Sequence, residues 1–520
     1  MLFKMKKSAI LSAILLISLS INAQTIVSSF NKISSLSGNF NATLDENDWF
    51  GIALDSLGDL NNDGVNDIVI GAGRDDDGGV NRGAVYILFL NTDGSVQSEQ
   101  KISSTTGNFT GTLNDGDVFG TAVASIGDLN NDGITDIAVG AEYDSDGGNW
   151  SGAVWILFLN EDGTVQSHNK INESDLGVDI SGTPAFGSSI ANIGDINNDG
   201  FVDLAVGSRR DEDGGPYRGA VWILFLDENG EVQDSQKISE TQGNFNHDLD
   251  SEDFFGCTIA NIGDLNSDGI TDIAVGAYND DDGGTNNGAI YILFLDSDGT
   301  VSNSQKISTT EGGFNRDLNT GGRLGNSVSP TGDLDGDLIM DLFAGTPKQE
   351  TIDGLSGAAF IIYLNANGTV KDQQEFAPGL NGFNTNLNDG DLFGKSVAYI
   401  GVLGDTKTLI VGASHDDDGG ENKGACWVLK LKGTLPSDFN ISDATSNRVQ
   451  LYPNPTSDYI YLKNAQEEAL LTIRNAIGQI VNKITIDRNQ QVDVSQLKPG
   501  TYFISIDGIE QKYQLIINPK

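Results

Sequence analysis

The sequence predicts an all-β fold: a six-bladed β-propeller with four antiparallel strands per blade, followed by a small C-terminal β-sandwich. The first observation is an acidic loop that recurs at nearly constant spacing. The glycine that opens it, which is followed by Asp in the first five copies, falls at steps of 69, 67, 69, 69 and 69 residues, from Gly58 to Gly401. The second is that short strand-like runs flank every loop, while no stretch shows the sustained 3.6-residue periodicity of helical repeats. Four-stranded units repeated in this way are typical of propeller blades.

Each unit contains four strands in a fixed order, which the second unit illustrates. The first strand, residues 121–126, follows a Phe-Gly pair, and the second, residues 136–140, follows the acidic loop. The third, residues 153–159, follows Gly and is apolar throughout, as expected of a strand buried on both faces. The fourth, residues 164–171, follows an Asp-Gly pair that suits a tight hairpin turn.

The sixth unit lacks a fourth strand of its own. Its third strand, residues 425–431, is followed by neither the Asp-Gly hairpin nor the Lys-Ile-Ser segment that ends the earlier units, whereas residues 25–34 end in Lys-Ile-Ser. We therefore expect the N-terminal strand to complete the last blade, which closes the ring and removes an open sheet edge. The predicted propeller spans residues 24–432.

Five of the acidic loops have the ligand spacing of a calcium site. Side-chain oxygens occupy positions 1, 3, 5 and 9, position 7 would add its backbone carbonyl, and a glycine stands at position 6 in the first four copies. Ca²⁺ takes six to eight oxygens at about 2.3–2.6 Å, and glycine permits the sharp turn inside such a loop. The predicted ligands of four to five structural Ca²⁺ sites are Asp59, Asn61, Asp63, Val65 and Asp67; Asp128, Asn130, Asp132, Ile134 and Asp136; Asp195, Asn197, Asp199, Phe201 and Asp203; Asp264, Asn266, Asp268, Ile270 and Asp272; and Asp333, Asp335, Asp337, Ile339 and Asp341.

These loops are interpreted as structural, because they repeat blade by blade, whereas a functional site would occur once. The fifth loop has its glycine displaced to position 4 and is expected to bind more weakly, and the decayed sixth loop is expected not to bind.

A second acidic set lies between the second and third strands of five units. Alternating strand direction places it on the face opposite the calcium loops. One interpretation is a set of solvated turns; the other is a cation-dependent docking surface with Trp49, Trp150 and Tyr217 as contact aromatics. The candidate ligand-face residues are Asp75, Asp77, Asp144, Asp146, Asp211, Asp213, Asp280, Asp282, Asp416 and Asp418.

Composition narrows the classes of partner. The formal net charge is −44, and the sequence shows no basic patch, so we expect no nucleic-acid partner. The three histidines, His168, His247 and His415, occupy non-equivalent repeat positions, and no nucleophile elbow, zinc-helix motif or phosphate loop occurs. We therefore expect that the protein is not an enzyme. We also expect it to be a monomer.

The first 23 residues have the pattern of a secretory signal peptide. Lys4, Lys6 and Lys7 precede an apolar run, and cleavage is expected between Ala23 and Gln24. The run is short for a membrane span, which needs about 20 residues, although an uncleaved anchor is the alternative. No other segment suggests a transmembrane span in the mature chain.

The C-terminal part differs in composition. Residues 433–447 form a polar linker, and residues 448–520 contain short alternating strands of a small β-sandwich, at 459–462, 470–473, 478–481, 501–506 and 514–517. This segment resembles the type A C-terminal sorting domain of the type IX secretion system. The shared marks are Tyr452-Pro453-Asn454-Pro455, Asn475-Ala-Ile-Gly478, Leu497-Lys-Pro-Gly-Thr-Tyr502 and the last residue, Lys520. The resemblance implies a Gram-negative bacterial protein that is secreted or held at the outer cell surface, with residues 448–520 as the segment that the secretion machinery reads.

The repeats also resemble a known family. The Phe-Gly pairs (Phe50-Gly51, Phe119-Gly120, Phe186-Gly187, Phe255-Gly256 and Phe393-Gly394), the acidic loops and the Gly-Ala pairs (such as Gly83-Ala84 and Gly152-Ala153) look like FG-GAP repeats of the integrin α-subunit propeller. In that family cations bind on one face and ligands on the other, although integrins have seven blades. The expectation is an exported, calcium-binding adhesion or ligand-binding protein with an extracellular protein or glycan ligand. The alternative is an exported polysaccharide-binding or polysaccharide-degrading protein.

Overall fold

The computed structural model describes residues 24–176, 183–319 and 321–434, and in the C-terminal part 450–452, 459–463, 469–475, 480–486, 491–494, 496–498, 500–506 and 512–517. The chain divides into two compact units, of which the first ends at Leu435 and the second begins at Pro436. The proposed signal segment with Ala23, and most of the proposed linker, lie outside the described residues.

The first unit is a six-bladed β-propeller of four-stranded antiparallel sheets, as predicted. Blades one to three contain β2 (Phe50–Gly58), β3 (Asp67–Ala72), β4 (Ala84–Leu90) and β5 (Val96–Ser103); β6 (Ala122–Gly127), β7 (Asp136–Ala141), β8 (Ala153–Leu159) and β9 (Val165–Ile171); and β10 (Phe186–Gly194), β11 (Asp203–Ser208), β12 (Ala220–Leu226) and β13 (Val232–Ile238). A short 3₁₀ helix, η1 (Glu173–Leu176), lies between blades two and three.

Blades four to six follow the same order. They contain β14 (Phe255–Gly263), β15 (Asp272–Ala277), β16 (Ala289–Leu295) and β17 (Val301–Ile307); β18 (Ser327–Gly332), β19 (Asp341–Thr346), β20 (Ala358–Leu364) and β21 (Val370–Phe376); and β22 (Phe393–Leu403), β23 (Thr406–Ala413) and β24 (Ala425–Thr434), which is completed by β1 (Gln24–Ser34).

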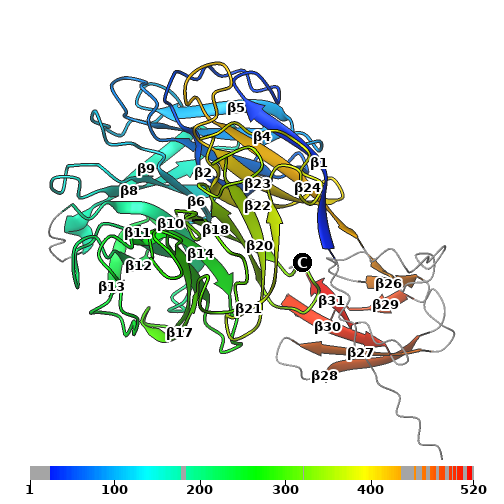
Figure 1. Cartoon of the computed structure of the whole chain (residues 1–520). Coiled ribbons are helices and arrows are strands. Elements are labelled where there is room, and N and C mark those ends of the chain that lie inside the picture. Colours follow the sequence, from blue (N-terminus) through cyan, green and yellow to red (C-terminus); the bar gives the residue numbers. More distant parts are fainter. Residues whose placement is uncertain are drawn as a thin grey trace, which may run out of the picture. The chain divides into compact units, whose positions relative to one another are not determined.

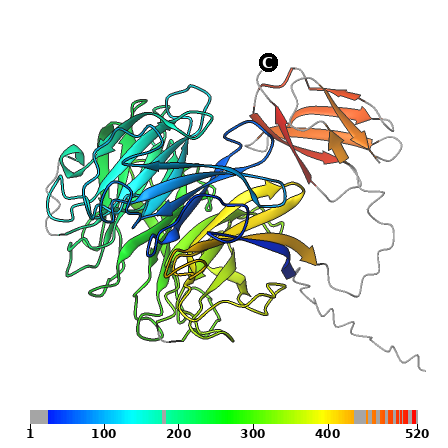
Figure 2. The same cartoon turned by 90° about the horizontal axis from the view of Figure 1, so that it is seen from above.

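The N-terminal strand closes the ring, as the sequence predicted. β1 pairs antiparallel with β24 along its whole length, from Gln24 opposite Thr434 to Ser34 opposite Ala425, and the two strands lie side by side in both views (Figures 1 and 2). The innermost strands β2, β6, β10, β14, β18 and β22 each contact the next one around the ring, and β22 contacts β2. The sheets therefore share a common centre, and the first and last strands of the described propeller, β1 and β24, pair with each other.

Six apolar cores lie between neighbouring blades, one for each interface. The core between blades one and two, for example, combines Val85 and Phe89 of β4 with Phe119, Val139 and Trp155 of the next blade. The other five clusters repeat this arrangement around the ring, including one that joins blade six to blade one. The third strands of blades one to five are buried along their full length because they are covered on both faces.

The Phe-Gly and Gly-Ala motifs meet across these interfaces. Phe119 at the start of blade two pairs with Gly83 of blade one, and the same bridge recurs at every interface, with Leu324 in place of phenylalanine before blade five and Phe50 opposite Gly424 at the closure. The aromatic rings are fully or almost fully buried. A side chain on Gly71 would collide with the carbonyl oxygen of Gly120, so glycine is required for this close approach between blades.

The second unit contains two antiparallel sheets. One has the order β25 (Gln450–Tyr452), β26 (Tyr459–Lys463), β29 (Gln491–Asp493); the other has the order β28 (Ile480–Ile486), β27 (Ala469–Asn475), β30 (Gly500–Ile506), β31 (Lys512–Ile517). The short strands β25 and β29 were not predicted, and β28 begins two residues later than expected. Leu471, Ile473 and Ile504 are buried on the larger sheet.

Candidate functional site

Strand direction places two sets of loops on opposite faces of the propeller. First strands end, and second strands begin, at the acidic loops such as residues 59–66, whereas second and third strands are joined at the other end by loops such as residues 73–83. We call the first end the metal-loop face and the other end the opposite face. The two acidic sets therefore lie on opposite faces, as predicted, because successive strands of each blade run in opposite directions.

The first four metal loops share one hydrogen-bond network. In the first loop, Asp63 N and Gly64 N donate to the two carboxylate oxygens of Asp59, both at 2.8 Å, and Asp63 N also donates to Asn61 Oδ1 at 2.9 Å. The loops that begin at Asp128, Asp195 and Asp264 repeat these contacts at 2.8–3.0 Å. The backbone thus orients the side-chain oxygens of positions 1 and 3 in the same way in four separate blades.

Position 9 anchors each loop to its sheet. Asp67 is fully buried and accepts hydrogen bonds from Leu60 N at 3.0 Å and from Leu90 N, at the end of the third strand, at 3.2 Å. Burial raises the pKa of Asp67 to about 6. Asp136, Asp203, Asp272 and Asp341 are buried in the same way. Together with positions 1, 3 and 5, the donor set is all oxygen and carries three carboxylates in each of the first four loops and four in the fifth, so these residues fit a hard divalent cation such as Ca²⁺.

The fifth loop differs from the first four. Carboxylate oxygens of Asp333, Asp335 and Asp341 lie within 4.8 Å of one another, and Lys371 Nζ lies 2.7 Å from both Asp335 and Asp337. Because its glycine is displaced, Leu338 occupies position 6 with a φ of 72°, which a non-glycine residue rarely adopts. An acidic cluster is therefore present, but a lysine of the same blade already neutralises part of it.

The sixth position carries no loop of this kind. β22 and β23 continue to pair until Leu403 opposes Thr406, so that only Gly404 and Asp405 form the turn. This short hairpin replaces the nine-residue loop of the other blades.

The candidate ligand-face aspartates are paired within their own blades. Lys101 Nζ lies 2.8 Å from Asp75 and 3.0 Å from Asp77, and Tyr86 Oη donates to Asp75 at 3.1 Å. The same lysine–aspartate arrangement joins Lys170 to Asp144 and Asp146, Lys237 to Asp211 and Asp213, Lys306 to Asp280 and Asp282, and Lys32 of β1 to Asp416 and Asp418. The first aspartate of each pair is buried, so this geometry ties the loop to the fourth strand rather than presenting both carboxylates to a partner.

Blade five lacks both the buried aspartate and the lysine, which indicates that the two positions are linked. Gln349 stands where the other blades have the buried aspartate, and Glu375 stands where they have the lysine. Glu375 instead pairs with Arg316, at 2.9 Å between Nε and Oε2. Sequence analysis did not connect these positions, although their joint replacement in one repeat was a usable signal.

The three candidate aromatics have different surroundings. Trp49 lies against Arg74, whose Cζ is 3.6 Å from the ring centroid, and stacks on His415 with centroids 5.1 Å apart. Tyr217 stacks on Phe254. Trp150 contacts Tyr143 yet remains 46% exposed, so of the three it offers the most surface to a partner.

The interior of the ring contains a group of cationic residues that the sequence did not reveal. A central cavity of about 890 Å³, lined by the innermost strands and by loops of the opposite face, collects Arg74, Arg209, Arg323, Lys348 and Lys395. These residues come from repeats one, three, five and six, and apart from Arg74 and Lys348 they stand at different repeat positions, so only the closed ring brings them together.

Comparisons with known proteins agree with this architecture. Models described as "FG-GAP repeat" match residues 50–88, 119–157, 186–224, 258–293 and 385–429, which fall in blades one to four and six. A model described as "Secretion system C-terminal sorting domain" matches residues 450–518. A propeller with repeated acidic loops and this tail defines a class of exported repeat proteins. The chain contains FG-GAP repeats and a type IX secretion system C-terminal sorting domain, and it is exported to the outer surface or extracellular space of a Gram-negative cell.

Curated relatives include integrin alpha-2 of Mus musculus, 36% identical over 166 residues, which is 31% of this chain and 13% of that protein. Integrin alpha-6 of Homo sapiens is 41% identical over 155 residues, or 29% of this chain and 12% of that protein. The chain thus spans a small fraction of the length of these integrin subunits.

Two solved structures are similar at low scores. One is BBS1N in complex with ARL6DN, with a TM-score of 0.38 and 14% identity over 80% of this chain and 99% of that one. The other is PorZ, a surface component of the type IX secretion system of Porphyromonas gingivalis, with a TM-score of 0.33 and 13% identity over 87% of this chain and 58% of that one. Within the described part of the chain, no helix is long and apolar enough to cross a membrane.

Proposed function

We propose that the mature protein is a calcium-stabilised extracellular binding protein that contacts a protein or glycan ligand through the opposite face. The observation that carries this proposal is the distribution of exposed apolar side chains. Of the eight large hydrophobic residues exposed in the described propeller, six lie at loops of the opposite face: Leu36, Val80, Trp150, Ile352, Leu355 and Leu380. Exposed apolar groups that gather on one face of an acidic protein are typical of an interaction surface.

Blade five is the centre of this surface. Its loop between the second and third strands lacks the aspartate–lysine pair and presents Ile352, 81% exposed, and Leu355, 48% exposed. A side chain on Gly379 would lie 3.3 Å from Ile352 Cδ1, so the neighbouring connection that carries Leu380 adjoins this loop. The irregular repeat thus offers an apolar contact where the other repeats offer acidic turns.

In this proposal the metal loops are scaffold. Ca²⁺ bound in four to five loops would offset acidic charge on the metal-loop face and hold the blades in register, while ligand contact takes place at the other end. The proposal assigns no catalytic activity to the chain. Turnover of a glycan by the purified protein would replace it with the polysaccharide-degrading alternative.

The test is binding of the purified chain, residues 24–520, to immobilised matrix proteins, polysaccharides and bacterial cells, with calcium and with a chelator. We expect saturable binding with calcium that is reduced at least tenfold in the Ile352→Ser/Leu355→Ser variant. The matched control is Val402→Ser, which removes an apolar side chain 52% exposed on the metal-loop face. Equal loss in both variants, or binding to none of these surfaces, would overturn the proposal.

A further inference from the structure

The central cavity has the opposite charge to the molecule around it. Its lining contains five cationic residues and two carboxylates, Asp55 and Glu142, a net of three positive charges, whereas the whole chain has a net charge of −44. The cavity volume of about 890 Å³ lies in the range of small-molecule sites, about 300–1,000 Å³. The acidic composition of the chain does not account for a positively charged cavity at the centre of the propeller.

Most of these cations lack a carboxylate partner. Arg209 is paired, with its Nε 2.9 Å from Glu142 Oε2 and its Nη2 3.1 Å from Oε1. Asp55 is occupied by the backbone, because it accepts from Ser56 N at 2.8 Å and from Ser125 N at 2.7 Å. Within the described part of the chain no ion pair involves the remaining cations, Arg74, Arg323, Lys348 and Lys395.

Aromatic rings rather than acids position the two unpaired guanidinium groups. Arg74 lies over the face of Trp49, and Arg323 Cζ lies 5.0 Å from the ring centroid of Tyr278. Stacking holds a guanidinium by its face and leaves its N–H groups at the edge, where they match the two oxygens of a carboxylate or sulfate. The Nε of Arg323 is buried and has no hydrogen-bond partner among the described residues.

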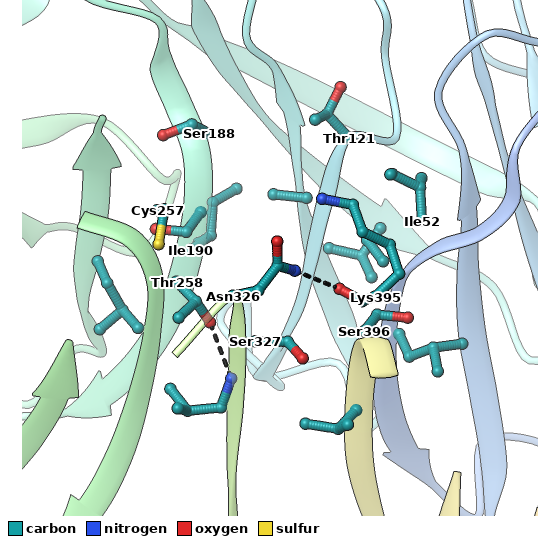
Figure 3. Close-up of a pocket in the computed structure, with 18 of the residues that line it drawn as sticks. Ile52, Thr121, Ser188, Ile190, Cys257, Thr258, Asn326, Ser327, Lys395 and Ser396 are labelled. Carbon is teal, nitrogen blue, oxygen red and sulfur yellow. Dashed lines mark hydrogen bonds between the residues drawn. The ribbon is translucent and has the colours of Figure 1, made fainter. Parts of the chain in front are cut away.

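Lys395 extends from β22 into the space between the innermost strands, and no drawn hydrogen bond reaches its ammonium (Figure 3). Burial and the charge of Arg209 lower the pKa of Lys395 to about 8, and Arg323 lowers the pKa of Lys348. These effects show that the cations lie close enough to repel one another. Such an arrangement costs stability when empty, and a bound anion would offset that cost by linkage.

We propose that the central cavity is a binding site for a small oxyanion, a carboxylate or sulfate group that is either free or carried on a sugar. Arg74, Arg323, Lys348 and Lys395 would bind its oxygens, and Trp49 and Tyr278 would fix the two guanidinium groups. This proposal deepens the proposed function, because the cavity is lined by loops of the opposite face and the anion would form part of the ligand recognised there.

The test is isothermal titration of the calcium-saturated chain, residues 24–520, at low ionic strength with three probes: sulfate, succinate and a glucuronic-acid disaccharide. We expect binding of at least one probe, weakened at least tenfold by Lys395→Met and by Arg323→Gln. Arg82→Gln is the control, because it removes one positive charge at a residue paired with the exposed Asp115 outside the cavity. Binding of all three probes assigns a free oxyanion, and binding of the disaccharide alone assigns an anion carried on a sugar.

A second readout separates a binding role from a folding role. Lys395→Met removes a buried, unpaired charge, so without probe its melting temperature should equal or exceed that of the wild type, while the rise caused by the probe should disappear. No binding of any probe at 10 mM (on the order of the weakest useful affinity), or equal weakening by Arg82→Gln, would overturn the proposal. Either result would leave the Ile352 and Leu355 surface untouched, so the two proposals fail separately.

Discussion

Lys101 neutralises a buried carboxylate, and its removal should destabilise the protein. The side chain of Asp75 is 3% exposed, and Lys101 is its cationic partner, while Tyr86 Oη and Asp77 N donate hydrogen bonds to it. The Lys101→Met variant leaves that charge buried without a cation, which typically costs about 3–5 kcal/mol. We expect the free energy of unfolding to decrease by about 3 kcal/mol, at the lower end of this range, because Tyr86 Oη and Asp77 N still donate to the carboxylate. Chemical denaturation in saturating calcium measures this decrease.

The double variant Asp75→Asn/Lys101→Met is the control for this pair. It removes both charges, so no buried carboxylate is left without its cation, and Asp77, which also loses Lys101, is partly exposed to solvent. The double variant should therefore lose less stability than Lys101→Met alone. Blade five supports this expectation, because it carries Gln349 and Glu375 in place of the pair and still forms its four strands. A double variant that is less stable than the single variant would contradict the assignment.

Asp253 predicts a pH dependence that does not involve the metal loops. It lies in the connection to blade four, and burial followed by the charge of Asp280 raises its pKa to about 7 from an ordinary value of 3.8. The folded protein therefore retains a proton that the unfolded chain has released between pH 4 and 7, so this residue lowers stability as pH rises through that window. Asp253→Asn should be more stable than the wild type at pH 8, and the advantage should shrink at pH 5.

The measurement is the melting temperature of both proteins at pH 5 and pH 8 in saturating calcium. Asparagine keeps an oxygen that can accept the hydrogen bond from Asp250 N, which is 2.7 Å in the wild type, so the substitution changes charge more than packing. A difference between the two proteins that is the same at both pH values would show that Asp253 is already ionised in the fold.

At the scale of elements, sequence periodicity predicted the strands within each blade well and the contacts between neighbouring blades less well. The third strand of blade two was predicted at residues 153–159 and occupies those residues, because an apolar run buried on both faces has clear limits. The pairing of Phe119 with Gly83 was not predicted, since it joins motifs of neighbouring repeats rather than parts of one repeat. β25 and β29, with three residues each, are too short to show an alternating pattern.

The fifth metal loop predicts a weak site that one substitution should strengthen. Lys371 pairs with Asp335 and Asp337, so a cation must displace the ammonium before it binds. Blades one to three have glutamine at the same register, at Gln97, Gln166 and Gln233. We expect calcium titration of the wild type to give four similar sites and a weaker fifth, and Lys371→Gln to raise the affinity of the fifth at least threefold.

Isothermal titration of calcium into the chelator-treated chain measures both quantities. The control variant Asp333→Asn removes a ligand at position 1 of the same loop, and it should abolish the weak site while leaving the other four. If Lys371→Gln leaves the titration unchanged, the lysine does not compete with the cation. The displaced glycine and the strained backbone of Leu338 would then account for a weak site.

At the scale of the whole molecule, ring closure creates properties that no single repeat encodes. The candidate cation ligands could be proposed from the sequence because the five residues of each set lie within nine positions of one another. The cationic cavity was not found, because Arg74, Arg209 and Lys395 are separated by more than a hundred residues from one another and stand at different repeat positions. A repeated sequence pattern reveals a feature that each repeat contains by itself. The cavity is different, because its lining residues come from different repeats and meet only when the ring has closed.

Closure also determines how calcium should act on stability. Each apolar core is shared by two neighbouring blades, and β1 joins the first residues of the propeller to the last, so the blades are expected to unfold together. A filled site stabilises the folded chain by about 2.7 kcal/mol when calcium exceeds its Kd a hundredfold, and sites in one cooperative unit add. The melting temperature of residues 24–520 should therefore rise steeply with calcium concentration in a single transition of the propeller.

A chelator should reverse the rise, and magnesium should reproduce little of it, because Mg²⁺ demands a compact octahedral site and retains its water. An unchanged melting temperature would mean that the amide-to-carboxylate bonds of Asp59 and its equivalents suffice to hold the loops, which would remove calcium from the scaffold.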